Sequence, residues 1–292
     1  PPSSPRRQYC DLSRYRRRLE RRSYDDRVNR TVAPRAGVLK GKKLPKVVIK
    51  ESKATRTGCG ETLLEMGQEN ENIVVLGADV TGSVKTDMFM KAFPDRFFSV
   101  GIAEQDMIGT AAGLAIAGKI PIASAYGEFA TGRPYDQIRQ SVAYSNLNVK
   151  ICASHCGITV GPDGATHQSL EDLALMRVLP NMIVLSPSDY VETKKMIRAV
   201  INHKGPAYVR FFRDNTAVFN DESTPFEIGK AVKLIDGNDV TIIACGLQVW
   251  ESILAEEILS AEGISVRLLN MHTIKPIDRG AIVQAAKETG AM

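Results

Sequence analysis

Short apolar runs that alternate with segments of helical character constrain this chain more than any other feature of its sequence. The runs are continuous, which is typical of strands buried on both faces of a sheet. They lie at residues 73–77, 97–100, 120–125, 149–153, 182–185 and 207–211. Helical patterns lie between them, at residues 106–117, 133–144, 170–178 and 190–202. Strands that alternate with helices indicate a parallel sheet with helices on both faces, so we predict an α/β fold.

A polar, turn-rich segment at residues 220–226 predicts a linker between two domains. The first domain would occupy residues 47–219, and its earliest elements would be a short strand at 47–50 and a helix around 62–66. A second α/β pattern occupies residues 227–292, with strands at 240–245 and 265–269 and helices at 247–261 and 278–287. Because a typical domain has about 100 residues or more, we expect this second domain to be truncated.

The first 46 residues differ from the rest of the chain in charge. They hold 11 Arg and 4 Lys against 4 acidic residues, whereas the remaining 246 residues carry 23 basic and 29 acidic groups. A segment so rich in Arg and so poor in apolar residues cannot bury a core, so we expect it to be disordered. A nucleic-acid-binding tail or a transit-like leader has the same composition. We expect this basic head to have no function of its own, and we expect no nucleic-acid partner.

The remaining composition indicates an ordinary globular protein, with 43% hydrophobic and 24% charged residues. No apolar run approaches the roughly 18 residues that a membrane-spanning helix needs. The five cysteines are scattered without a CxxC pair, a pattern that supports neither a disulfide framework nor a zinc site. We therefore expect a cytoplasmic protein with no membrane partner and no metal ligands of its own.

The stretch from Ser154 to Leu173, SHCGITVGPDGATHQSLEDL, concentrates chemically useful side chains in one loop. Its three glycines and one proline prevent a helix or strand from running through its middle. His155, Asp163 and His167 lie in it, directly after an apolar run, and open α/β sheets bind ligands at the carboxyl ends of their strands. The loop is therefore a candidate site for proton transfer or for binding sugar or phosphate. An ordinary connection with surface histidines fits the same spacing.

Several segments, taken in order, resemble the landmarks of transketolases. They are ATR at 54–56, GADVTGS at 77–83, GIAEQ at 101–105, YDQIRQ at 135–140, SHCGITVGPDGATHQSLEDLA at 154–174, PSD at 187–189 and NMHTIKPID at 270–278. The match covers residues 47–292 and is closest to the C-terminal subunit of split transketolases. The resemblance implies a pyrimidine-binding domain followed by part of the C-terminal domain.

The resemblance also implies thiamine diphosphate as cofactor and assigns residues to it. Glu104 matches the glutamate that shares a proton with ring nitrogen N1′, which makes the cofactor's own amino group a base. Phe129 resembles the aromatic residue that stacks on the aminopyrimidine ring, with Tyr126 as a neighbouring contact. Asp79 matches an aspartate near the cofactor in the subunit interface.

A second set of residues matches substrate contacts of the family. His155, Asp163 and His167 match positions that contact sugar hydroxyls and help to move protons during the reaction. Arg56, Ser83 and Arg213 match contacts to the substrate phosphate, which suits the planar fork of arginine. The neighbouring Arg210 is an alternative to Arg213. The chain departs from the family at Pro162, where a glutamate is usual.

The family's diphosphate and metal motif, a Gly-Asp-Gly followed by a distant Asn, does not occur in a suitable context in this sequence. We therefore expect an N-terminal transketolase subunit as partner, with Mg²⁺ bound through that partner, in a dimer or heterotetramer acting on sugar phosphates. The expected reaction transfers a two-carbon ketol unit from a ketose phosphate to an aldose phosphate. A deoxyxylulose-phosphate synthase, an oxo-acid dehydrogenase β subunit and a non-catalytic assembly module remain as alternatives.

Overall fold

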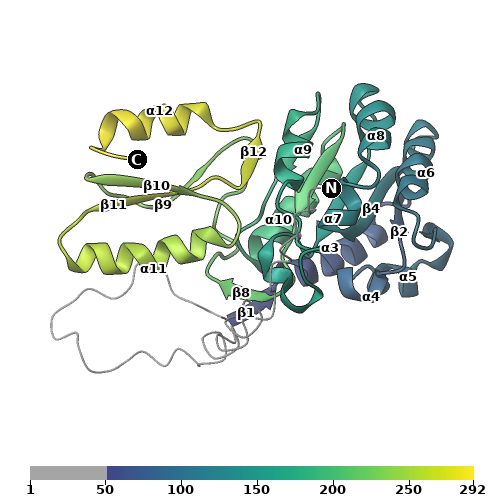
Figure 1. Ribbon diagram of the computed structural model, residues 1–292, viewed down its shortest axis with the longest axis horizontal. Helices are drawn as coiled ribbons and strands as arrows, with labels where there is room; N and C mark the ends of the chain where they lie inside the picture. The colour runs from purple at the N-terminus through teal and green to yellow at the C-terminus, as the bar shows by residue number, and fades with distance from the viewer. Residues whose placement is uncertain (1–50) are drawn as a thin grey trace, which may run out of the picture. The chain divides into compact units, whose positions relative to one another are not determined.

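The computed structural model describes residues 51–292 (Figure 1). The basic head at 1–46 and the strand expected at 47–50 lie outside the described residues. Within residues 51–292, no helix is long and apolar enough to cross a membrane.

A seven-stranded sheet forms the larger part of the described chain, in the order β12-β6-β7-β5-β4-β2-β3. Its strands are β2 (Ile73–Gly77), β3 (Phe97–Ser99), β4 (Ile120–Tyr126), β5 (Lys150–Ser154), β6 (Ile183–Leu185), β7 (Ala207–Arg210) and β12 (Thr273–Lys275). The six strands from β2 to β7 pair in parallel, as the apolar runs predict. The sheet has one further strand at its edge, β12, which pairs with β6 in the antiparallel direction. The three-residue β12 directly precedes Pro276, so the sequence carries little strand signal there.

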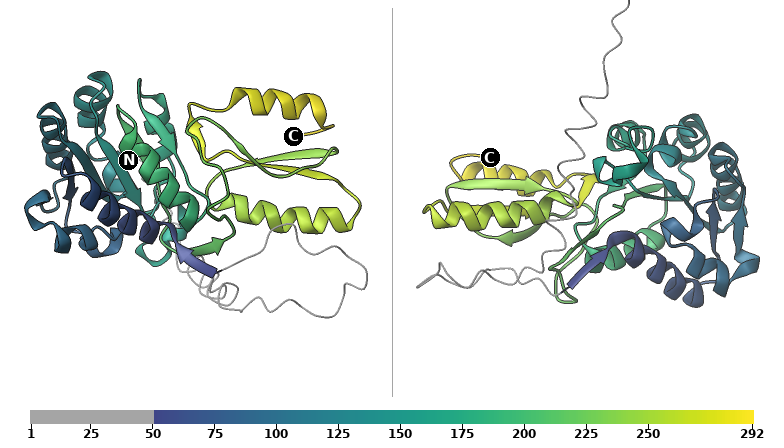
Figure 2. Two further views of the ribbon diagram at one scale, coloured as in Figure 1. Left: turned by 180° about the vertical axis from the view of Figure 1, so that it is seen from behind. Right: turned by 60° about the horizontal axis from the view of Figure 1, so that its bottom comes forward.

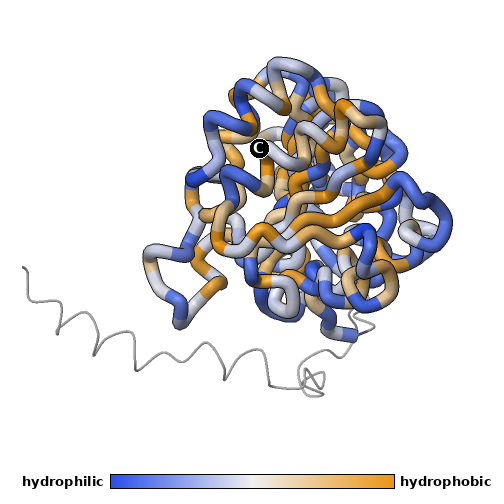
Figure 3. Tube along the Cα trace, turned by 90° about the vertical axis from the view of Figure 1, so that its right-hand side faces the viewer, coloured by the Kyte–Doolittle hydropathy of each residue, from blue (hydrophilic) through white to orange (hydrophobic). Residues whose placement is uncertain are grey.

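Helices cover both faces of this sheet (Figures 1 and 2). One face packs against α6 (Glu104–Ile116), α9 (Asp172–Val178) and a π-helical segment, Ile138–Tyr144, that continues α8 (Tyr135–Gln137). The other face packs against α3 (Thr55–Glu69), α5 (Asp87–Ala92) and α10 (Tyr190–Asn202). Alternate strand residues serve the two cores, so that Ile151 and Ala153 face one layer while Cys152 faces the other. Hydrophobic stretches accordingly run through the interior (Figure 3).

Helix α3 begins earlier than its apolar pattern suggests, so that Arg56 lies in its first turn rather than before it. Two of the three glycines in this helix lie where neighbouring backbone approaches it closely. A Cβ atom at Gly58 would lie 2.9 Å from the carbonyl oxygen of Tyr190, and one at Gly60 would lie 2.3 Å from that of Lys85. Tertiary packing therefore overrides the weak helix propensity of these glycines.

A two-stranded antiparallel ribbon joins the start of the described chain to the segment that follows β7. It pairs β1 (Glu51–Ala54) with β8 (Asn215–Val218). Both strands have only four residues, and the sequence analysis predicted neither. The ribbon fixes the start of α3 beside the exit of β7, which brings Arg56 close to Arg213.

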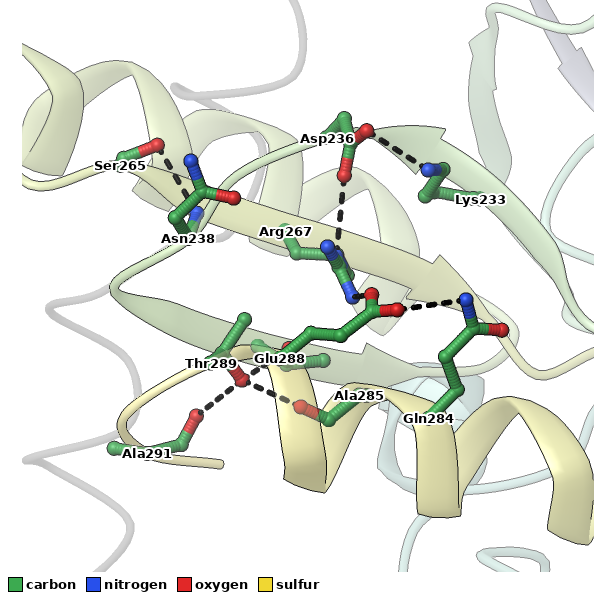
Figure 4. A network of polar contacts seen from close by, with 11 residues as sticks. Lys233, Asp236, Asn238, Ser265, Arg267, Gln284, Ala285, Glu288, Thr289 and Ala291 are labelled. Atoms are coloured by element: carbon green, nitrogen blue, oxygen red, sulfur yellow. Dashed lines mark hydrogen bonds and ion pairs between the residues drawn. The ribbon is translucent and has the colours of Figure 1, made fainter.

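The last part of the chain forms a smaller sheet of three strands in the order β10-β11-β9. Its elements are β9 (Val232–Ile235), β10 (Val240–Ala244), α11 (Gln248–Ala261), β11 (Val266–Asn270) and α12 (Arg279–Glu288). Strands β10 and β11 are parallel, whereas β9 is antiparallel to β11. Arg267 on β11 contacts Asp236 and Glu288, which ties the end of α12 to the sheet (Figure 4).

Buried polar contacts join this last part to the seven-stranded sheet. Glu192 on α10 accepts hydrogen bonds from the backbone and hydroxyl of Ser188 and from the side-chain amide of Asn270 on β11. Asp189 caps the start of α10 by accepting from the backbone amide of Glu192. The residues between β8 and β9, which include the expected linker at 220–226, contain no helix or strand in the structure.

Candidate functional site

The candidate site lies at the carboxyl edge of the seven-stranded sheet, where four parallel strands end. Tyr126 is the last residue of β4 and pairs with Ser154, the last residue of β5. His155 follows directly, so both rings leave the sheet side by side. Gly77 at the end of β2 pairs with Ser124, and the short helix α4 (Thr81–Val84) that carries Ser83 starts four residues later. The parallel register therefore brings distant motifs to one edge.

Four rings form a continuous cluster at this edge. The Tyr126 ring stacks on the His155 ring with centroids 4.0 Å apart. Phe129, in the short helix α7 (Gly127–Thr131), stacks at 6.0 Å from Tyr126 and meets the His167 ring edge-on at 4.9 Å. His167 also lies 6.2 Å from Tyr126. The structure thus brings together four of the residues that the sequence analysis selected.

The loop that carries the two histidines is closed at its base. The backbone amide of Gly157 donates to the carbonyl of Ser169, and Cys156 pairs with Ser169 as an isolated bridge. A 3-10 segment, Ile158–Asp163, includes Gly161 at φ 69° and ψ −113°, a conformation that a side chain disfavours. His155 itself has φ 61°, an uncommon value for a residue other than glycine. Strained backbone of this kind is concentrated at functional sites.

Two arginines approach the same histidine, and neither forms an ion pair with a carboxylate within residues 51–292. Arg56 donates to the backbone carbonyl of Ser83 at 2.6 Å, and Arg213 donates to that of Val160 at 2.6 Å. Burial, followed by the positive charges of Arg56 and Arg213, lowers the pKa of His155 to about 4. His155 is therefore a neutral ring at pH 7, and its Nδ1 lies 3.0 Å from the Ser154 hydroxyl.

Asp163 and Asp79 are exposed, in contrast to the rings. Asp163 lies in the histidine loop, close enough for its charge to raise the pKa of His155 against the other influences. Asp79 directly follows the end of β2 and has a left-handed backbone, with φ 60°. Within residues 51–292 its side chain forms no hydrogen bond or ion pair, so the structure does not bring it into the ring cluster.

Glu104 opens α6 and is buried, with 4% of its surface exposed. Its carboxylate accepts two hydrogen bonds from one nitrogen of Arg133, at 2.9 and 3.0 Å. The guanidinium of Arg133 also lies over the face of Phe129, 3.9 Å from the ring centroid. Arg133 thereby links Glu104 to the aromatic cluster. The sequence analysis missed Arg133 because its two partners lie in separate segments, and only its place just before the YDQIRQ segment could have suggested it.

Another arginine, Arg210, lies directly beneath the site and forms an ion pair with a carboxylate. Asp172, with no exposed surface, accepts from Nε of Arg210 at 2.8 Å and from the Tyr208 hydroxyl at 2.7 Å. Burial raises the pKa of the adjacent Cys156 thiol to about 12, so this thiol is unreactive. Of the two arginines that the sequence left as alternatives, Arg210 supports the loop and Arg213 faces the site.

Within residues 51–292, no group of three or more His, Cys, Asp or Glu side chains is arranged to hold a metal ion. The binding of Mg²⁺ through a partner subunit stays a prediction.

Family models match almost all of the described chain. The transketolase pyrimidine binding domain matches residues 51–218, and the transketolase C-terminal domain matches residues 229–292. The α/β fold described above agrees with both. The chain belongs to the transketolase family.

Known relatives include both split and full-length transketolases. The chain is 54% identical to a putative transketolase C-terminal section of Methanocaldococcus jannaschii over 81% of this chain and 75% of that protein. It is 42% identical to a 6-deoxy-6-sulfo-D-fructose transketolase subunit of a Clostridium species over 80% of this chain and 72% of that subunit. Against the human transketolase it is 36% identical over 84% of this chain but only 40% of that protein. The chain therefore corresponds to the C-terminal part of a full-length transketolase.

Solved structures of split and full-length transketolases also match the chain. A structure described as "Split gene transketolase, inactive beta4 tetramer" matches with a TM-score of 0.76 and 46% identity, covering 82% of this chain and 78% of that one. Transketolase from Leishmania mexicana matches with a TM-score of 0.71 and 26% identity over 81% of this chain and 38% of that one. These matches confirm the predicted fold class.

Proposed function

We propose that this chain is the C-terminal half of a two-subunit transketolase and that its edge site transfers a ketol unit between sugar phosphates. The observation that carries the proposal is the buried carboxylate of Glu104 beside an aromatic cluster and a neutral histidine at one sheet edge. Buried titratable groups in such a position are characteristic of catalytic sites. The family models and relatives favour transketolase over the synthase, dehydrogenase and assembly alternatives.

The residues present fit the aminopyrimidine end of thiamine diphosphate, which supplies a carbanion at its thiazolium carbon when bound. Glu104 is buried at this edge, and we propose that its carboxyl group shares a proton with ring nitrogen N1′. Phe129 offers an aromatic face and Tyr126 a second ring beside it, which suits a flat heterocycle. Asp79, exposed at the end of β2, is proposed to contribute near the cofactor from the subunit interface.

The substrate would lie across the histidine loop with its phosphate toward the arginines. His155 is neutral at pH 7, so it can accept or donate a hydrogen bond to a sugar hydroxyl without a charge change. His167 and Asp163 are less buried and are proposed to hold the hydroxyls next to the reacting carbons. Arg56 and Arg213 would bind the phosphate, with Ser83 beside Arg56.

We further propose that activity requires an N-terminal subunit that holds the diphosphate and Mg²⁺, in a heterotetramer. The split gene transketolase described as an inactive beta4 tetramer supports this requirement. A cytoplasmic location remains a prediction.

The test is ketol transfer from xylulose 5-phosphate to ribose 5-phosphate by the chain alone and by the chain mixed with a split-transketolase N-terminal subunit. We expect activity only in the mixture. The Glu104→Gln variant should lose at least a hundredfold in kcat, because proton transfer by a positioned group contributes about 10² to 10⁴. Asp106→Asn is the matched control, since Asp106 is an exposed carboxylate in the same helical turn.

Retention of full activity in Glu104→Gln would contradict the role of this residue. An inactive mixture, with both subunits folded and associated, would contradict the proposed reaction for these two sugars.

A further inference from the structure

Arg133 makes two contacts at once, and each is a contact that the proposed cofactor needs. One of its guanidinium nitrogens lies 2.9 and 3.0 Å from the two carboxylate oxygens of Glu104. The guanidinium plane lies over the Phe129 ring at 3.9 Å from the centroid. A flat group therefore already covers Phe129 and already donates to Glu104.

We propose that Arg133 occupies the place of the aminopyrimidine ring and acts as a gate that must swing away before the cofactor binds. This inference rests on the proposed function, in which the same ring stacks on Phe129 and bonds to Glu104. Two flat groups cannot stack on the same face of Phe129 at once, and the Arg133 nitrogen that bridges both Glu104 oxygens lies where N1′ would approach. Arg133 and the cofactor consequently compete for a single position.

The surroundings of Arg133 allow its side chain to move while its backbone stays fixed. The side chain is 46% exposed, although its partner Glu104 is 4% exposed. Within residues 51–292 the guanidinium donates to no group other than Glu104. The backbone carbonyl of Arg133 accepts from the Gln105 amide at 3.2 Å, which anchors the chain next to the start of α6. Displacement thus breaks one partly exposed ion pair and one stacking contact.

The gate has a thermodynamic consequence. If the open state is only a fraction of the population, the apparent cofactor affinity falls by that fraction. In the closed state the Glu104 carboxylate is in contact with a cation. Without that contact the carboxylate would be buried and unpaired. The cofactor-free chain is thereby stabilised at the expense of cofactor affinity.

The test measures the dissociation constant of thiamine diphosphate by isothermal titration calorimetry. The cofactor is titrated, with Mg²⁺ present, into the cofactor-free complex of this chain with an N-terminal subunit. Arg133→Ala clears the Phe129 face and frees Glu104, so we expect binding about tenfold tighter than in the wild type, equivalent to about 1.4 kcal/mol. Arg133→Met removes the charge but leaves an apolar side chain near the ring, so its gain should be smaller. Arg139→Ala is the control, because it removes an exposed arginine from the same region of the chain.

The outcomes separate this inference from the proposed function. Tighter binding in Arg133→Ala than in Arg133→Met, with Arg139→Ala unchanged, would support the gate. Equal or weaker binding in Arg133→Ala, in a complex that binds the cofactor and transfers ketol units, would overturn the gate and leave the proposed function intact. A folded wild-type complex that binds no cofactor would overturn both.

Discussion

The arginines that line the site and the arginine beneath it are held in opposite ways. Arg56 and Arg213 donate to backbone carbonyls, and within residues 51–292 neither forms an ion pair with a carboxylate. Arg210, only a few residues away, is paired with the fully buried Asp172. The difference indicates that the half-buried Arg56 and Arg213 are available for an anionic ligand, whereas the buried pair maintains the structure beneath them.

Removing the buried carboxylate should have the largest effect. In Asp172→Ala, Arg210 and the Tyr208 hydroxyl lose their shared partner in the protein interior. Breaking a buried pair in this way costs about 3–5 kcal/mol. Chemical denaturation, followed by circular dichroism, should show this loss of unfolding free energy. A loss below about 1 kcal/mol would contradict the structural role of the pair.

Glu192 provides a contrast to Asp172, because it is a buried carboxyl group held by neutral donors instead of an arginine. Burial, reinforced by the nearby Asp189 charge, raises the pKa of Glu192 from 4.5 to about 7. Its favourable contribution to stability is therefore fully present below pH 4.5 and is lost as the pH rises through about 7. We expect a stability difference of no more than about 3.5 kcal/mol across this window, at about 1.4 kcal/mol for each pKa unit.

The measurement is the difference in unfolding free energy between wild type and Glu192→Gln at several pH values from 4.5 to 8. The variant cannot ionise at this position, so the wild type should lose stability relative to it as the pH rises. A constant difference over the whole range would show that the pKa of Glu192 is the same in the folded and the unfolded chain, which would contradict the raised pKa.

Much of the fold follows from the sequence because buried parallel strands leave continuous apolar runs. The bounds of β2 agree with the predicted run at 73–77, and α10 agrees with the predicted helix at 190–202. The ribbon of β1 and β8 and the edge strand β12 were missed because their stability comes from pairing with distant segments, which a short local pattern does not record.

The site was predictable to a similar extent. The motifs selected the rings of Tyr126, Phe129, His155 and His167, and the structure packs them together. Their roles stay predictions until they are tested. The choice between Arg210 and Arg213 required the structure, because the burial of Asp172 decides it and sequence spacing does not.

The most direct test of the contrast between free and paired arginines is a pair of measurements on Arg213→Ala in the active complex: the KM for the ketose phosphate donor and the free energy of unfolding. We expect the KM to rise about tenfold to a hundredfold, since a hydrogen bond to a charged group contributes about 1.5–3 kcal/mol. The unfolding free energy should change by less than about 0.5 kcal/mol. An unchanged KM, or a loss of stability as large as that of Asp172→Ala, would contradict the account.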